Sequence, residues 1–157
     1  MAKQSAGLLM FRRLPGRPLE VLLAHPGGPF WAKKDLGAWT IPKGEYTDED
    51  PLVAAQREFQ EETGCMPAGP FIELATIRQK SGKVVSAWAF EADWDPCGLR
   101  SNDFELEWPK GSGKMQAFPE VERAEWFTIE EARRRMLPAQ VPLLDRLVAW
   151  LDGNSSG

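Results

Sequence analysis

The sequence contains one histidine, two cysteines and no long apolar run. Because His25 stands alone, mechanisms that need two histidines are excluded, and a Ser-His-Asp triad would have to use this residue. The two cysteines, Cys65 and Cys97, lack the spacing of a metal site, so we interpret them as free thiols in a reducing compartment. Carboxylates are therefore the leading candidates for chemistry.

Apolar runs of only a few residues are too short to span a bilayer. The first ten residues lack the basic start, long apolar core and cleavage site of a secretory leader. Nineteen basic and 23 acidic residues leave a net charge of −4, which argues against broad binding to nucleic acid or anionic membranes. We expect a cytoplasmic protein, monomer or homodimer, with no membrane association and no stable nucleic-acid partner.

The length of 157 residues is that of one average domain, and 43% apolar with 27% charged residues is close to globular averages. Neither an internal repeat nor a low-complexity linker divides the chain. The sequence predicts a single α/β domain over residues 1–152, followed by a flexible tail over residues 153–157.

Apolar and β-branched stretches between Gly/Pro turns predict a series of strands. These are residues 5–12, 19–25, 38–41, 71–78, 84–93, 104–108 and 125–127. Loops are expected over residues 43–50 and 118–120. Thr128 is expected to cap a helix ending near Met136, and leucines at helical spacing from Leu143 to Leu151 predict a C-terminal helix.

The clearest predicted element is a helix over residues 51–63. Asp50 is a good N-cap, Pro51 suits the first helical position, and Gly64 suits a left-handed C-terminal stop. At about 100° per residue, Leu52 and Phe59 fall on one apolar face that can pack onto a sheet.

Three glutamates, Glu58, Glu61 and Glu62, lie at i, i+3 and i+4 of this helix and crowd one ridge. Like charges at this spacing repel unless a cation or a basic residue neutralises them. A divalent cation is one solution, and oxygen-only ligands suit Mg²⁺ or Mn²⁺ bound together with phosphates. The alternative is an ordinary solvated acidic face.

The segment from Gly44 to Cys65 closely resembles the signature of the Nudix hydrolases, G-x5-E-x7-R-E-U-x-E-E-x-G-U with U apolar. Glu49 lies at the x7 distance before Arg57, and residues 57–64 match without a gap. Only four residues separate Gly44 from Glu49, one fewer than in the pattern. The resemblance implies a Nudix α/β/α sandwich, with a mixed β-sheet between helices, over about residues 3–152.

By this resemblance the metal ligands are Glu58, Glu61 and Glu62, with the backbone of Gly44 as a further contact. The implied cofactor is Mg²⁺, with Mn²⁺ as a substitute, and one of the glutamates, Glu61 or Glu62, also accepts a proton from the attacking water. Arg57 is implied as an orienting partner paired with Glu49.

Some Nudix enzymes supply the general base from a loop before a late strand. Glu120, six residues ahead of Trp126, is the candidate here, with Glu122 and Glu107 behind it. The alternative for Glu120 is a surface carboxylate.

The run from Trp39 to Gly44 resembles the W-x-x-P-K-G entry of Nudix enzymes that act on dinucleoside polyphosphates and diphosphoinositol phosphates. It implies that Lys43 contacts phosphate. Lys33 and Lys34 form either an anion funnel or solvated loop lysines.

Four aromatic residues are candidates for stacking on a base, with core positions as the alternative. They are Phe30, Trp31, Trp39 and Trp108. His25 ends a predicted strand, where a hydrogen bond is a better interpretation than catalysis.

Two functions follow from the resemblance. The first is an Mg²⁺-dependent pyrophosphohydrolase of a nucleoside diphosphate linked to another group, with dinucleoside polyphosphates or nucleoside triphosphates as the expected small-molecule substrates. The second is a non-catalytic nucleotide or ADP-ribose sensor. Intact glutamates in the motif favour the enzyme, because a pure binder could lose them without penalty.

Overall fold

The computed structural model describes residues 3–154 as a mixed sheet between helices. The elements are β1 (Gln4–Arg12), β2 (Glu20–Pro26), β3 (Lys43–Glu45), α1 (Pro51–Thr63), β4 (Ile72–Arg78), β5 (Val84–Glu91), β6 (Asp103–Glu107), β7 (Met115–Pro119), β8 (Val121–Thr128), α2 (Ile129–Arg135) and α3 (Pro142–Asn154). Short 3₁₀ turns occur at Pro96–Gly98 and Pro138–Gln140.

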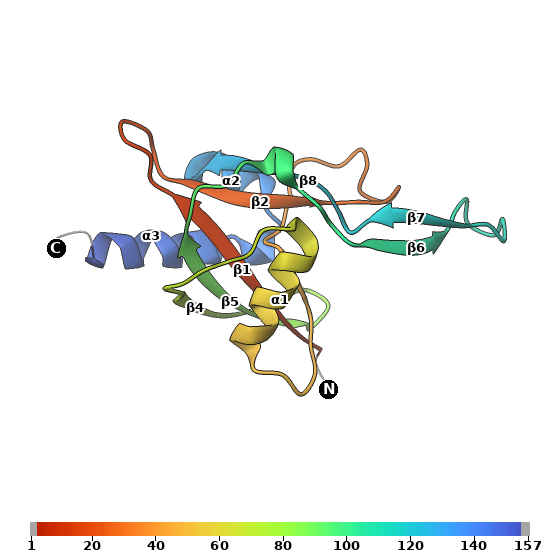
Figure 1. The fold of residues 1–157 in the computed structure, drawn as a ribbon, viewed down its shortest axis with the longest axis horizontal. Coiled ribbons are helices and arrows are strands. Elements are labelled where there is room, and N and C mark those ends of the chain that lie inside the picture. The colour runs from red at the N-terminus through yellow and green to blue at the C-terminus, as the bar shows by residue number, and fades with distance from the viewer. Residues whose placement is uncertain (1–2, 155–157) are drawn as a thin grey trace.

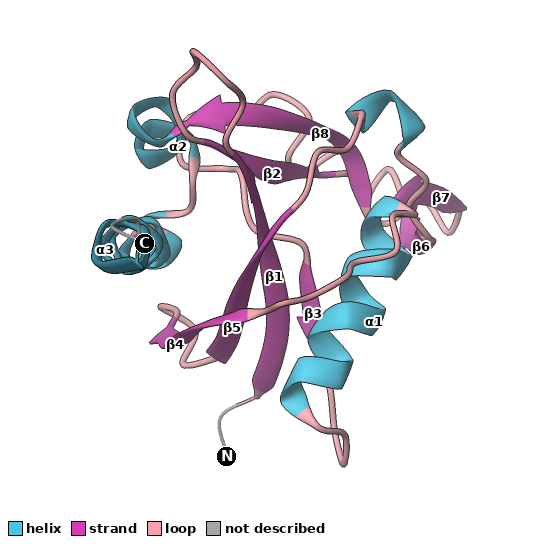
Figure 2. Cartoon of the chain, turned by 60° about the vertical axis from the view of Figure 1, so that its left-hand side comes forward, coloured by secondary structure: helices cyan, strands magenta, loops and turns pink. Residues whose placement is uncertain are grey.

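The main sheet has the strand order β4-β5-β1-β2-β8, and β3 pairs with β1. The β1–β5 pair is parallel, whereas the other pairs are antiparallel, so the sheet is mixed. Helix α1 covers one face, and α2 and α3 cover the other (Figure 2). This arrangement confirms the predicted α/β/α sandwich.

Strand β1 lies at the centre of the sheet and is buried on both faces. Leu9 and Phe11 join the apolar cluster beneath α2 and α3, whereas Leu8 and Met10 join the cluster beneath α1 that includes Phe59. A strand covered by helices on both sides needs apolar residues at successive positions, because neither face meets water. The core thus holds α1 at a fixed place on the sheet.

Several predicted boundaries were wrong. Residues 38–41 form no strand but two isolated bridges, Thr40 with Ala24 and Trp39 with Met136. The predicted 43–50 loop begins with β3, the predicted loop at residues 118–120 includes the end of β7, and the short strand at residues 125–127 is the longer β8. Cross-strand partners far along the chain create or extend these strands, which local composition cannot register.

Helix α3 is longer than the predicted C-terminal helix. Helix α3 reaches Asn154, so residues 153 and 154 are helical rather than part of a tail, and the rest of the predicted tail lies outside the described residues. None of the described helices combines the length and apolarity needed to cross a bilayer. Cys65 and Cys97 are free, as predicted.

Strands β6 and β7 form a separate two-stranded hairpin that projects from the body of the molecule (Figure 1). Phe104 and Phe118 are opposite one another in its register and their ring centroids are 6.0 Å apart. Glu120 is the single residue between β7 and β8, so the base of the hairpin leads directly to it.

Candidate active site

Helix α1 carries the acidic ridge and is closed at both ends as predicted. The Asp50 side chain accepts a hydrogen bond from the backbone N–H of Val53 at 3.2 Å, and Gly64 ends the helix in the left-handed conformation with φ 80°. Phe59 packs edge-to-face on Phe90, with ring centroids 5.3 Å apart. Caps and core contact together fix the direction in which the glutamates point.

Glu58 lies against β3, where Gly44 leaves room for it. A Cβ at Gly44 would come within 2.0 Å of Oε2 of Glu58, so a side chain there would displace the carboxylate. Glu58 is only 9% exposed, and burial raises the pKa of its carboxyl. The motif glycine therefore acts here by making space for a buried acid.

Arg57 ties the acidic residues together. Its Nε and Nη2 donate to the two carboxylate oxygens of Glu49 at 3.0 and 2.8 Å, which confirms the expected pairing. Its Nη1 lies 2.8 Å from Oε1 of Glu58 and 3.3 Å from Oε2 of Glu61. A planar guanidinium that holds one carboxylate at two points orients the others, because its remaining donor has a fixed direction.

Glu62 is half-buried and faces β3. It accepts a hydrogen bond from the backbone N–H of Lys43 at 3.2 Å. Burial raises the pKa of Glu62 to about 8, against the lowering effect of that bond and of the Lys43 charge. Burial likewise lowers the pKa of Lys43, helped by the nearby Lys83 and opposed by Glu62. Lys43 therefore lies at the acidic site, where the sequence placed a phosphate contact.

Glu120 reaches the same site through a chain of backbone hydrogen bonds. Asn102 donates its N–H to the carbonyl of Glu61 at 3.0 Å and accepts from the N–H of Glu120 at 2.8 Å. Burial raises the pKa of Glu120, and the negative charges of Glu58 and Glu61 raise it further. Asn102 was not predicted, and because its backbone makes these bonds, its residue type offered no signal.

The two reserve candidates for the general base are engaged elsewhere. Oε1 of Glu122 lies 2.5 Å from Nδ1 of His25. Oε1 of Glu107 accepts a hydrogen bond from the backbone N–H of Gly111, 2.7 Å away at the tip of the hairpin. Glu120 remains the candidate general base, and the negative charges of Glu58 and Glu61 on the acidic ridge help to raise its pKa.

Trp39 does not lie on a binding surface. It is fully buried, and its indole N–H donates to Asp35 at 2.8 Å. Its ring packs edge-on against His25 and Phe127, with centroid distances of 5.0 and 4.9 Å. The expected substrate contact is therefore wrong for this residue, and the alternative core position holds.

The other predicted contacts with substrate remain at the surface. Phe30 is 72% exposed, Trp108 is 37% exposed on the hairpin, and Trp31 is partly exposed. Lys33 and Lys34 are exposed, and Nζ of Lys34 lies 5.0 Å from the centroid of the Trp31 ring. Except for Trp108, these residues belong to one mostly exposed segment over residues 27–37 that carries both lysines, named the 27–37 loop.

The donor set of the acidic site fits a hard divalent cation. Within residues 3–154, no three Asp, Glu, His or Cys side chains stand close enough together to hold a metal as placed. The residues nevertheless offer only oxygen donors, and the pKa values of Glu58, Glu62 and Glu120 are all raised. Burial is the main cause, and mutual repulsion adds to it, so a divalent cation would stabilise the ionised forms.

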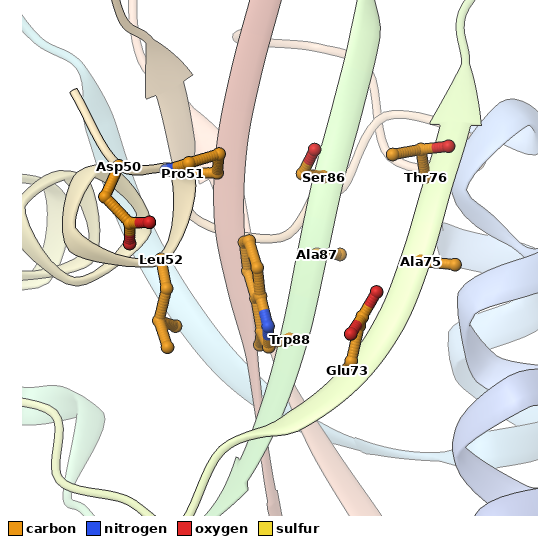
Figure 3. A pocket seen from close by; sticks show the side chains of 9 residues that line it. All are labelled: Asp50, Pro51, Leu52, Glu73, Ala75, Thr76, Ser86, Ala87 and Trp88. Atoms are coloured by element: carbon orange, nitrogen blue, oxygen red, sulfur yellow. The ribbon is translucent and has the colours of Figure 1, made fainter. Parts of the chain in front are cut away.

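One hollow near the same helix is separate from the acidic site. It has a volume of about 340 Å³ and lies between the start of α1 and strands β4 and β5 (Figure 3). Its lining includes Asp50, Glu73 and Trp88. It includes none of the acidic-site residues Glu58, Glu61, Glu62 and Glu120. It therefore contributes nothing to the arrangement of the acidic residues.

Without divalent metal, the free energy of unfolding is expected to fall as pH rises between about 4.5 and 8. The pKa of Glu62 rises from 4.5 to about 8 on folding, so the folded state binds this proton more tightly than the unfolded state does. This contribution to the free energy of unfolding is fully present below pH 4.5, the unfolded-state pKa. It is lost as the pH rises through the folded-state pKa of about 8.

Urea unfolding in the presence of a chelator measures this slope. Glu62→Gln should make the free energy of unfolding less dependent on pH. Glu125→Gln, at an exposed position on β8, should leave this pH dependence unchanged. An equal slope in the Glu62→Gln variant would contradict the assignment.

A family model described as "NUDIX domain" matches residues 1–151. RNA pyrophosphohydrolase of Stenotrophomonas maltophilia is 45% identical over 49 residues, which are 30% of this chain and 24% of that protein. The protein of the same name from Xylella fastidiosa is 41% identical over 49 residues, or 30% of this chain and 26% of that protein. The chain thus spans about a quarter of the length of these curated relatives.

Two solved structures resemble the whole fold. A binary complex of the Caenorhabditis elegans Ap4A hydrolase has a TM-score of 0.67 at 23% identity, covering 95% of this chain and 98% of that chain. The NUDIX domain of Shewanella oneidensis NrtR, complexed with ADP ribose, has a TM-score of 0.65 at 16% identity, covering 96% and 89%. At these identities the likeness shows a shared fold.

Proposed function

The chain belongs to the NUDIX family, and from this premise we propose that it is a pyrophosphohydrolase that hydrolyses a nucleoside diphosphate linked to another group in the presence of Mg²⁺. The observation that carries the proposal is the set of linked acids: Arg57 pairs with Glu58 and Glu61, and Lys43 lies beside Glu62. The charges of Glu58 and Glu61 also act on Glu120. The names of the curated relatives and the Ap4A hydrolase structure support a hydrolase of phosphate anhydrides.

Each residue of the site has a role in this reaction. Glu58, Glu61 and Glu62 would hold the cation, which when bound neutralises phosphate charge and makes a water molecule more acidic. Arg57 keeps Glu58 and Glu61 oriented. Glu120 is the proposed general base because its pKa is raised toward neutral pH, and a base with a pKa near the working pH transfers protons efficiently.

Dinucleoside polyphosphates are the proposed substrates, with nucleoside triphosphates second. The cationic Lys43 lies beside Glu62, where a phosphate oxygen would also approach the cation. Lys33 and Lys34 on the exposed 27–37 loop would meet phosphates farther from the cleaved bond. A long anhydride chain uses all of these positive charges, whereas a single phosphate does not. A cytoplasmic location is part of this proposal.

A substrate screen tests the proposal. We expect Mg²⁺-dependent release of nucleotide products from dinucleoside polyphosphates, with nucleoside triphosphates, nucleotide sugars and inositol pyrophosphates tested in parallel. Chelation should abolish turnover, and Mn²⁺ should restore part of it. Tight nucleotide or ADP-ribose binding without any turnover would instead identify the chain as a non-catalytic sensor.

A further inference from the structure

We propose that His25, together with Glu122, is a positioning residue that fixes the 27–37 loop against β8. The inference rests on the proposed function in one respect, namely that this loop contacts the phosphates of the substrate. His25 is fully buried and is the second-to-last residue of β2, which ends at Pro26 directly before the loop begins. Its ring is therefore placed between the loop and the strand that follows Glu120.

Both ring nitrogens of His25 face a partner. Nε2 lies 2.6 Å from the carbonyl oxygen of Lys34, and because that oxygen only accepts, Nε2 carries the proton of this bond. Nδ1 lies 2.5 Å from Oε1 of Glu122 in a close contact that lacks the alignment of a hydrogen bond. The imidazole thus connects the middle of the loop to a carboxylate on β8.

A β-bulge directs Glu122 toward the histidine. Strand β2 pairs His25 with Arg123 and then Pro26 with Val121, so Glu122 is the extra residue on β8. Bulges next to functional sites commonly change the direction of one side chain. The bulged residue lies two positions after Glu120. Glu122 therefore contacts His25, whereas Glu120 lies within reach of the charges of the acidic ridge.

Among the described residues, few hydrogen bonds hold residues 28–34 of the loop. In the part of the chain that the structure describes, the hydrogen bonds of residues 28–34 stay within the loop, except the one from His25. Its first end is fixed because Gly27 donates to the carbonyl of Glu120 at 3.0 Å, and its last end because Gly37 donates to the carbonyl of Arg134 at 3.1 Å. Asp35, which follows Lys34, is held as well, because its carboxylate accepts from the Trp39 indole at 2.8 Å and from Arg135 at 2.6 Å. Within residues 28–34 of the described chain, His25 is the hydrogen-bond partner from outside the loop.

Limited trypsin digestion tests the positioning without any need for enzymatic activity. Cleavage after Lys33 and Lys34 is compared, within each sample, with cleavage after Lys80 in the β4–β5 turn. His25→Asn removes the group at Nε2, and loss of this buried bond should raise the relative cleavage by about fivefold. His25→Gln, whose amide reaches the Nε2 position, should restore most of the protection.

Glu122 supplies an independent variant pair at a less buried position, where its side chain is 33% exposed. Glu122→Ala should also raise the relative cleavage, whereas Glu122→Gln, whose amide can still contact Nδ1, should behave like the parent protein. Glu125→Gln, at an exposed position on the same strand, is the matched control. Unchanged cleavage in Glu122→Ala and in a folded His25→Asn variant would overturn the proposal.

Kinetics with a substrate from the screen supply the second measurement. Because the loop contacts substrate remote from the cleaved bond, His25→Asn and Glu122→Ala should raise KM by about fivefold and leave kcat within about twofold. A fall in kcat at unchanged KM would overturn the positioning role. If no substrate is turned over, the proposed function fails, while the digestion result still decides whether His25 fixes the loop.

Discussion

Glu61→Gln and Glu62→Gln are each expected to lower kcat by about a hundredfold to ten-thousandfold with little change in the fold. Both side chains lie on the ridge of α1 that faces Lys43 and Glu120. An amide keeps the volume but removes the negative charge that would hold the cation or accept a proton. Steady-state kinetics at saturating Mg²⁺, together with thermal unfolding followed by circular dichroism, measure the two effects separately.

Glu58 is less suitable for this test, because it is buried and paired with Arg57, so its replacement could disturb packing as well as chemistry. The matched control is Glu125→Gln, which removes a carboxylate from an exposed position on β8 and should keep the parent rate. Full activity in both the Glu61→Gln and the Glu62→Gln variants would show that these carboxylates are not needed for the reaction. It would also contradict the proposed cation site.

Trp39→Ala is expected to lower the free energy of unfolding by about 3–5 kcal/mol. The indole is fully buried against His25 and Phe127, and its N–H donates to Asp35. Truncation would leave a large cavity and an acceptor without its donor. In a domain of this size, such a loss corresponds to a fall in Tm of roughly 6–20 °C, measurable by calorimetry.

Trp108→Ala is the matched control, since this tryptophan is 37% exposed on the hairpin and its removal should cost within about 1 kcal/mol. The comparison also separates the two interpretations of Trp39. If Trp39→Ala raised KM strongly and left the free energy of unfolding unchanged, Trp39 would be a substrate contact. Its placement in the core would then be wrong.

The acidic helix could be predicted closely from the sequence, because each of its determinants is local. Asp50, Pro51 and Gly64 act within one turn of the helix ends, and the spacing of Glu58, Glu61 and Glu62 depends only on helical geometry. The match of residues 44–65 to a family signature then implied the sandwich around it. Element type and chemistry were both encoded over about twenty consecutive residues.

Other parts of the site were decided by contacts between distant segments. Strand β3 exists because residues 43–45 pair with β1, and Glu120 joins the ridge because the backbone of Asn102 bridges it to Glu61. The W-x-x-P-K-G run implied substrate contacts for both Lys43 and Trp39. The fold places Lys43 beside Glu62 but buries the Trp39 ring beside Phe127.

By itself the sequence therefore determined which acids lie on one face of α1 and what class of chemistry they suit. Only the tertiary structure decided which carboxylates join them, which are held elsewhere, as Glu122 is by His25, and which aromatic rings reach solvent. The physical reason is that helix spacing and capping act over one or two turns, whereas burial, desolvation and strand pairing depend on residues up to a hundred positions away in the chain.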